Sequence, residues 1–585
     1  MSAPEERGAL TSRPSLYTCA VSVRHAEPEG PWCQEYAAPP ARIGPKGKAR
    51  RGWAEIRDEL TGLLGPLLMD PDAASAAEQL HRRFSAMDPP VHHRNIHRVV
   101  RGLPLENEAR ARAFARCLVR TGHGHPSVCV GLVLLARLGE PEDVPYLVTL
   151  GVLRDLAGPV VHALDTIDRS AAALISLRDQ ETKPELHGLV AALGAGDDAA
   201  VRAALVALPS TVAPGVARRV AEAAGAARLL RPGAPRAQAG ELTARLGWLL
   251  FWMTTMRDYT SEILLYEEAV CAYESFAWGA PHLEPTLDHY ALVLSAVQEL
   301  RSGPGSLHGW GPGRREAVIA ELAAVLDRAE WRAVVEQDGA DAGARWRTAW
   351  ARRARAQVAR DPAGPAEGLR IEVAERDPLD PGTVEARIVV GGRPLVPEVF
   401  GRGPANSPEW LLDSGRLRAT EESREVQLAE AYCTEGCCGA LHVTIRRDGG
   451  EVVWSDWRCP APSPSRPHVR EIPELRFDAA EYDAEIARAE NDHTWTWPAR
   501  KAARLIAAGL RDRPELLTRW GAELSWIGTE FRDPDRAVVS LRYAGEDGPP
   551  TYFKWYVPGA GTPPENRAAD ALNRLAAADP RTYGS

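Results

Sequence analysis

Hydrophobic residues recur at spacings of three and four along most of the first 360 residues, and this period is typical of amphipathic helices. The clearest stretch covers residues 112–167, where turns containing Gly or Pro separate four short apolar segments. A single short helix cannot bury its apolar stripe, so we predict that these helices stack as two antiparallel pairs. Further turns near 194–197 and Gly225 continue the pattern. The sequence therefore predicts a stacked helical array, with no strand between 107 and 225.

The hydrophobic period changes from 3.6 to 2 after residues 361–368, a segment rich in Pro and Gly. Alternation of apolar and polar residues is typical of strands with one buried face. The C-terminal part is therefore expected to contain strands, with helices at 477–489 and 498–510 between them. The predicted strands cover residues 369–373, 384–390, 425–431, 441–446, 451–454, 523–527, 538–543 and 552–557.

These patterns divide the chain into six segments. They are an irregular N-terminal segment over 1–50, a helical repeat domain over 51–235, a helical extension over 236–360, a linker over 361–368, an α+β domain over 369–558 and a C-terminal tail over 559–585. The predicted fold class is mainly α. It combines an N-terminal α-solenoid and a helical extension with a separate α+β domain that contains an antiparallel sheet.

Part of the helical array resembles HEAT repeats. A Gly-Glu-Pro turn precedes Asp143 and Val144, Leu147 follows on the first helix, and the returning helix carries Val160, Ala163 and Leu164. The resemblance implies a HEAT-like α-solenoid in which aliphatic side chains fill the seams and small residues lie where helices cross. An Asp at the start of a helix lies near unpaired N–H groups, so Asp143 is expected to stabilise the helix that follows it.

Composition narrows the class of protein. The 585 residues carry a formal net charge of -9, which at this length does not favour global attraction to nucleic acid or an anionic membrane. No apolar run approaches the ~20 residues of a membrane helix, and the N-terminus contains no apolar signal segment. Nine cysteines, an odd number spread over a long chain, do not form the pattern of a disulfide framework. We therefore expect a cytoplasmic protein.

Four cysteines are the candidate metal site of the sequence. Cys433, Cys437 and Cys438 lie in one turn between two predicted strands, and Cys459 follows one hairpin later. Four thiolates suit a tetrahedral Zn²⁺ ion, but zinc ribbons usually place a cysteine pair on each of two turns. Adjacent cysteines on a strand would also point to opposite faces. Thiols packed in the turn are therefore the main alternative, and a reactive thiol with His442 as its base is a further one.

Three runs in this region carry a second resemblance. They cover residues 433–441, 452–457 and 477–482. Together they look like an uncharacterised domain found in hypothetical proteins of actinobacteria. This resemblance implies no known activity, and it assigns a function to no residue.

Three further motifs have both a functional and a structural interpretation. His93 and His97 lie four apart, so one helical face could present both to a metal, but a partly exposed polar helix is the simpler explanation. Trp495 either covers the start of the following helix or lies in a binding groove. A basic stripe along the helix over 344–358 could bind nucleic acid. The stripe comprises Arg347, Arg352, Arg353, Arg355 and Arg360.

These observations favour a binding protein over an enzyme. The sequence contains no His-Glu-x-x-His, Gly-x-Ser-x-Gly or dinucleotide-binding motif, whereas a helical array offers a large concave surface. Our leading prediction is a non-enzymatic cytoplasmic scaffold that binds an unidentified protein partner. The alternatives are a zinc-thiolate enzyme or redox sensor that uses the Cys433 cluster, and a helical-repeat protein that binds nucleic acid.

Overall fold

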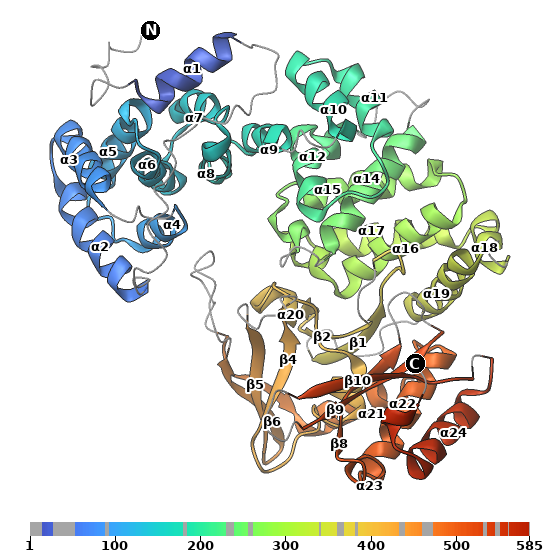
Figure 1. Ribbon diagram of the computed structural model, residues 1–585. Helices are drawn as coiled ribbons and strands as arrows, with labels where there is room; N and C mark the ends of the chain where they lie inside the picture. The colour runs from blue at the N-terminus through green and yellow to red at the C-terminus, as the bar shows by residue number, and fades with distance from the viewer. Residues whose placement is uncertain are drawn as a thin grey trace. The chain divides into compact units, whose positions relative to one another are not determined.

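The chain folds into two compact units, Met1–Trp252 and Met253–Ser585. The computed structural model shows helices in the first unit and both helices and strands in the second (Figure 1). It describes residues 14–26, 53–87, 93–179, 184–229, 239–255, 261–337, 341–359, 368–380, 384–431, 439–458, 472–529, 535–544, 550–559 and 561–583. Most of the predicted linker, residues 361–367, lies outside this part of the chain.

The named secondary-structure elements in the described part of unit 1 are all helices, and the four helices predicted over 112–167 are α5 to α8. The sequence and the structure agree that the described part of 107–225 contains no strand. The bounds are α2 Trp53–Met69, α3 Ala73–Ala86, α4 His93–Gly102, α5 Glu108–Thr121, α6 His125–Leu138, α7 Val144–Leu150, α8 Arg154–Leu164, α9 Arg169–Asp179, α10 Pro184–Ala195, α11 Asp198–Ala207, α12 Pro214–Ala223, α13 Ala226–Leu229 and α14 Ala239–Thr254.

α6 is the central helix of this array because nearly every residue on it is apolar. Buried residues run over 127–135 without a break, so these turns have no solvent-facing side. The helix packs against α3, α4, α5 and α8. Gly131 permits the close approach of α5, since a Cβ atom there would lie 2.9 Å from the carbonyl oxygen of Ala115. The helices from α1 to α9 therefore share one continuous hydrophobic core.

A helix lies within the N-terminal segment that the sequence predicts to be irregular. This helix, α1, covers Leu16–Ala26 and packs on α5 and α7. Leu16 and Ala20 lie four apart and are both buried, and the Leu16 N–H donates to the Gly122 carbonyl at 2.8 Å. The apolar face of this short helix is stabilised by tertiary contacts, which its local sequence does not reveal.

The turn between α6 and α7 gives Asp143 a role different from the expected one. Its side chain makes no hydrogen bond to the start of α7. Instead, the carboxylate accepts hydrogen bonds from the main-chain N–H of Glu140 and from the guanidinium of Arg116 on α5. Asp143 is 1% exposed. The residue therefore joins α5 to the turn, rather than capping the helix that follows.

The helical part of unit 2 surrounds α16, which is buried on most of its sides and packs against α17, α18 and α19. Helix α19 also contacts the first sheet. The indole N–H of its Trp350 donates to the Glu375 carbonyl at 2.9 Å. The helical extension and the first sheet thus belong to one compact unit. The bounds are η3 Glu262–Leu265, α15 Ala269–Gly279, η4 Ala280–His282, α16 Leu287–Ser302, η5 Pro304–Leu307, α17 Arg314–Leu326, α18 Ala329–Glu336 and α19 Ala342–Val358.

The described strands of unit 2 form three small antiparallel sheets. Their orders are β1-β2-β3, β4-β5-β6-β7 and β10-β9-β8. The strands are β1 Leu369–Glu375, β2 Val384–Val390, β3 Arg393–Pro394, β4 Arg424–Glu430, β5 Ala440–Asp448, β6 Glu451–Arg458, β7 Leu475–Asp478, β8 Ala522–Thr529, β9 Ala537–Tyr543 and β10 Thr551–Tyr556. The accompanying helices are α20 Leu395–Val399, η6 Glu409–Asp413, α21 Ala479–Asn491, α22 Pro498–Asp512, α23 Glu515–Thr518, α24 Pro564–Ala577 and η7 Pro580–Thr582.

Two C-terminal features are buried. The predicted tail contains α24, which packs against α22, where the side chain of Leu572 lies against Gly509. Trp495 is fully buried and its indole N–H donates to the Asp492 carbonyl at 2.7 Å. This position confirms that Trp495 covers the entry to α22. The alternative of an exposed tryptophan in a groove is wrong.

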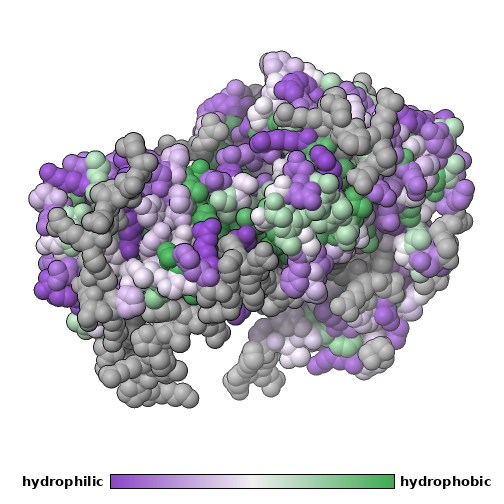
Figure 2. Space-filling view, turned by 90° about the horizontal axis from the view of Figure 1, so that it is seen from above, coloured by the Kyte–Doolittle hydropathy of each residue, from purple (hydrophilic) through white to green (hydrophobic). Residues whose placement is uncertain are grey.

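The surface of the described residues is mixed in character. Figure 2 shows hydrophobic residues in interrupted patches between hydrophilic ones on the face in view. Within the described part of the chain, no helix is both long enough and apolar enough to cross a membrane.

Candidate binding site

The four candidate cysteines lie outside the described residues, so the structure does not place them. Cys433, Cys437 and Cys438 fall within 432–438 and Cys459 within 459–471. His442, their candidate base, lies on β5 with its Nδ1 3.6 Å from a carboxylate oxygen of Glu425. The zinc-thiolate site therefore stays a prediction.

His93 and His97 lie on α4 but turn to different neighbours. The ring centroid of His93 is 6.4 Å from that of His125, and the ring centroid of His97 is 4.7 Å from that of His162. Among the residues that the structure describes, no group of three or more His, Cys, Asp and Glu side chains is arranged to hold a metal ion.

The described arginines of the basic stripe form ion pairs or hydrogen bonds with other residues of the chain. Arg347 is 7% exposed and binds Asp377 through two nitrogens, Nε at 2.9 Å and Nη2 at 2.7 Å. Burial opposes its charge, but the Asp377 carboxylate outweighs this effect and the pKa of Arg347 is raised. Arg353 binds Glu375, Arg355 binds Asp327, and Arg352 donates to a main-chain carbonyl of α18. Arg360 lies outside the described residues.

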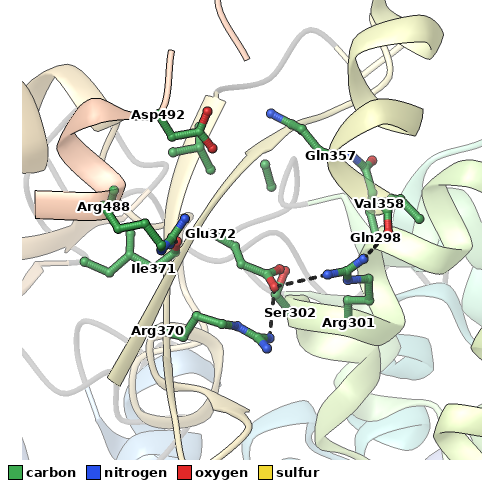
Figure 3. Close-up of a pocket in the computed structure, with 13 residues that line it drawn as sticks. Gln298, Arg301, Ser302, Gln357, Val358, Arg370, Ile371, Glu372, Arg488 and Asp492 are labelled. Atoms are coloured by element: carbon green, nitrogen blue, oxygen red, sulfur yellow. Dashed lines mark hydrogen bonds and ion pairs between the residues drawn. The ribbon is translucent and has the colours of Figure 1, made fainter. Parts of the chain in front are cut away.

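A pocket of about 250 Å³ lies in unit 2 between α16, the end of α19, β1 and α21 (Figure 3). Each of these elements supplies polar side chains. The pocket is lined by Gln298, Arg301, Ser302, Gln357, Val358, Arg370, Ile371, Glu372, Val373, Ala374, Arg488, Ala489 and Asp492. We take this pocket as the candidate binding site of the described residues.

Glu372 lies between two guanidinium groups on one side of the pocket. One carboxylate oxygen is 2.9 Å from Nη2 of Arg370 and 3.8 Å from Nη2 of Arg301, and both arginine side chains point toward it in Figure 3. Arg370 and Glu372 are neighbours on one face of β1 because side chains two apart on a strand point the same way. Their side chains are 23% and 21% exposed, so both remain accessible from the pocket.

The main chain of β1 completes the site because this strand lies at the edge of its sheet. The N–H of Ile371 donates to Glu485 at 2.6 Å and its carbonyl accepts from Arg488 at 2.7 Å. The carbonyl of Glu375 accepts from an indole N–H of α19. Alternate residues of an antiparallel strand turn their main-chain groups away from the neighbouring strand. Val373, midway between these two residues, therefore turns its N–H and C=O away from β2.

The pocket can bind charged and amide groups through several hydrogen bonds. Its described lining offers three guanidinium groups and two carboxylates, and it includes Val373 of the edge strand. Guanidinium groups bind carboxylates through paired, charge-assisted hydrogen bonds. No His, Cys or Lys side chain occurs in this lining. The arrangement suits recognition of a polypeptide segment or terminus.

This pocket was not among the sites predicted from the sequence. The alternation of Arg370 and Glu372 along the first predicted strand was the available local signal, since opposite charges two apart share one face. The other walls come from α16, which ends 67 residues before β1, from α19, which ends 11 residues before it, and from α21, which begins more than 100 residues after it. Their convergence depends on tertiary packing, which a local pattern does not contain.

Comparisons with family models, with curated protein sequences and with solved structures find no match for this chain. The resemblances to HEAT repeats and to an actinobacterial domain therefore stay predictions.

The histidines of unit 1 make its stability depend on pH. Burial, followed by the neighbouring His162 and Arg101, lowers the pKa of His97 from 6.5 to about 4. The unfolded chain therefore takes up a proton at higher pH than the folded chain, and folding loses stability as the pH falls from 6.5 toward 4. Because the ring is partly exposed, we expect a loss of about 1 kcal/mol.

Urea titrations of the wild type and of His97→Gln, at neutral pH and at about pH 4.5, measure this loss. The variant should show a smaller decrease in the free energy of unfolding on acidification. His187→Gln, at an exposed position on α10, is the control and should behave as the wild type. An equal decrease in all three proteins would show that His97 does not contribute.

Proposed function

We propose that the chain is a non-enzymatic binding protein and that the pocket beside β1 receives an extended segment of a protein partner. The feature that carries the proposal is the place of Val373 on the edge strand β1, where its main chain turns away from β2 beside a pocket lined by arginines. A partner residue in extended conformation would pair with this N–H and C=O as an added strand does. A nearby carboxylate of the partner, from an acidic side chain or the chain terminus, would bind the guanidinium groups.

In this proposal, the stacked helices of unit 1 form the scaffold on which partners bind. Helical arrays present extended surfaces on which partners bind. We place the protein in the cytoplasm because of its cysteine usage.

Selection of short random peptides on the full chain tests this function, with Val373→Pro as the discriminating variant. Proline removes the N–H that turns away from β2 but no hydrogen bond to that strand, so an edge strand tolerates it. Peptides enriched on the wild type should bind Val373→Pro about tenfold more weakly, the equivalent of one hydrogen bond.

Val373→Ile is the matched control, because it retains the N–H and nearly the same shape. It should bind the selected peptides as the wild type does. Circular dichroism of all three proteins checks that the strand is intact. Peptides that bind Val373→Pro with undiminished affinity, or a selection that enriches none, would contradict the proposed function.

A further inference from the structure

The third sheet has one face packed against helices and one face toward solvent. Helices α22 and α23 pack on this sheet, and the inward side chains of β8, β9 and β10 join the core that these helices form with α24. The outward side chains include Trp526 on β8, which is 42% exposed, and Tyr552 on β10, which is 60% exposed. An antiparallel sheet with one solvated face usually carries polar residues there. The exposed rings on this face therefore need an explanation.

A β-bulge directs Trp526 to the solvent face. Leu524 pairs with Leu541 and Trp526 pairs with Ser540, so Ser525 is one extra residue on β8. In a regular strand, residues two apart share a face, and Trp526 would join Leu524 in the core. Bulges often re-aim a side chain in this way. The exposure of Trp526 is thus a consequence of how the strand is built.

Two of the rings on this face have a cation beside them. The Nζ atom of Lys554, on β10, lies 5.8 Å from the ring centroid of Trp526. The guanidinium carbon of Arg536, just before β9, lies 4.1 Å from the ring centroid of Tyr556. Cations at such distances are attracted to the faces of aromatic rings. Each ring therefore lies next to a group that can bind an anion.

The third ring, Tyr552, is the cross-strand neighbour of Arg542 on β9. Arg542 forms an ion pair with Glu523 on β8, and these two side chains are 48% and 63% exposed. Tyr552 and Tyr556 lie about 14 Å apart, because a strand rises about 3.4 Å per residue. Aromatic rings and cations thus alternate across the solvent face of the sheet.

We propose that this face of the third sheet binds single-stranded nucleic acid. Unpaired bases stack on exposed aromatic rings, and the phosphates between the bases bind arginine and lysine. An acidic peptide would use the cations but not the rings, and an apolar partner would use the rings but not the cations. The distance along β10 suits a strand of about four nucleotides or more. The face shares no residue with the pocket beside β1, so this inference does not depend on the proposed function.

Fluorescence anisotropy of the full chain with labelled oligothymidylate and oligouridylate tests the proposal. At least one of the two should bind, and its affinity should fall as salt is added. Comparison of the two probes distinguishes DNA from RNA as the ligand. In the variant Trp526→Ala/Tyr552→Ala, the affinity should fall by about tenfold for each lost ring, the usual effect of removing one stacked base.

Trp410→Ala is the matched control. Trp410 is 40% exposed and belongs to the same compact unit, but it lies on η6, outside the third sheet. This variant should bind as the wild type does, and Trp526→Phe, which keeps a ring, should retain most of the affinity. Circular dichroism checks that each variant is folded. If the double variant is not, Tyr552→Ala alone serves, because this side chain is largely exposed.

Three outcomes would overturn the proposal. The first is a wild type that binds neither oligonucleotide. The second is unchanged affinity in Trp526→Ala/Tyr552→Ala, since the nucleic acid would then bind elsewhere on the chain. The third is displacement of the oligonucleotide by a glutamate peptide of equal charge at the same concentration, since the face would then bind anions without stacking. A duplex that binds as tightly as the single strand would have the same meaning.

Discussion

Replacing Arg387 by alanine should destabilise unit 2 by about 3–5 kcal/mol, because it breaks a buried ion network. Arg387 lies on β2, is 4% exposed and has Nη2 2.7 Å from a carboxylate oxygen of Glu299 on α16. Arg376 is the remaining cation near this carboxylate, at 3.5 Å. Without Arg387, the buried carboxylate of Glu299 would be left with a more distant partner.

The direction of the pKa shift supports this expectation. Burial opposes the charge of Arg387, but Glu299 and Glu385 outweigh that effect and raise its pKa. The charged form is therefore the stable one in the fold. The network holds α16 of the helical part against β2 of the first sheet.

Urea denaturation monitored by tryptophan fluorescence measures the effect. The control is Arg542→Ala, which breaks the exposed pair with Glu523 on the third sheet and should cost less than about 1 kcal/mol. The double variant Arg387→Met/Glu299→Gln should be more stable than Arg387→Ala because no buried charge is left without its partner. Equal losses for Arg387→Ala and Arg542→Ala would contradict the assignment.

Replacing Asp143 by alanine should destabilise unit 1 by about 2–4 kcal/mol. The carboxylate accepts hydrogen bonds from Arg116 at 2.8 and 3.0 Å and from the Glu140 N–H at 3.0 Å. Burial opposes the charge of Arg116, but its hydrogen bonds to Asp143 and Glu140 outweigh that effect and raise its pKa. Alanine would leave a guanidinium and an N–H without their buried acceptor.

Glu142 offers a matched control on the same arginine. Its side chain also binds Arg116, but it is 62% exposed, so Glu142→Ala should cost less than about 1 kcal/mol. Thermal unfolding of unit 1 distinguishes the two variants. If Asp143→Ala and Glu142→Ala unfolded at the same temperature, burial would not determine how strongly each carboxylate binds Arg116.

Elements with a strong local signal were predicted closely. The strand predicted over 384–390 is β2, Val384–Val390, because the alternating segment ends at Gly391 and Gly392, whose φ angles of 57° and 72° favour glycine. The helix predicted over 477–489 begins instead at Ala479. Asp478 accepts hydrogen bonds from the first N–H groups of α21, and the residues before it pair with β6 as β7. Pairing with a distant strand determined that boundary.

The candidate sites show the limit of local patterns. Spacing placed His93 and His97 on one helix correctly, but their partners come from α6 and α8, which no spacing reveals. The four described arginines of the stripe lie on the predicted helix, yet the groups that bind them lie on other elements.

The contacts between α19 and β1 have a practical consequence for the choice of recombinant fragments. The Pro- and Gly-rich segment over 361–368 suggests a domain boundary. A fragment that starts at Leu369 would contain every described strand. Such a fragment would lack Arg347 and Arg353, the guanidinium partners of Asp377 and Glu375, and the indole of Trp350. A recombinant fragment that keeps these contacts should therefore begin near Met253, where this compact unit starts.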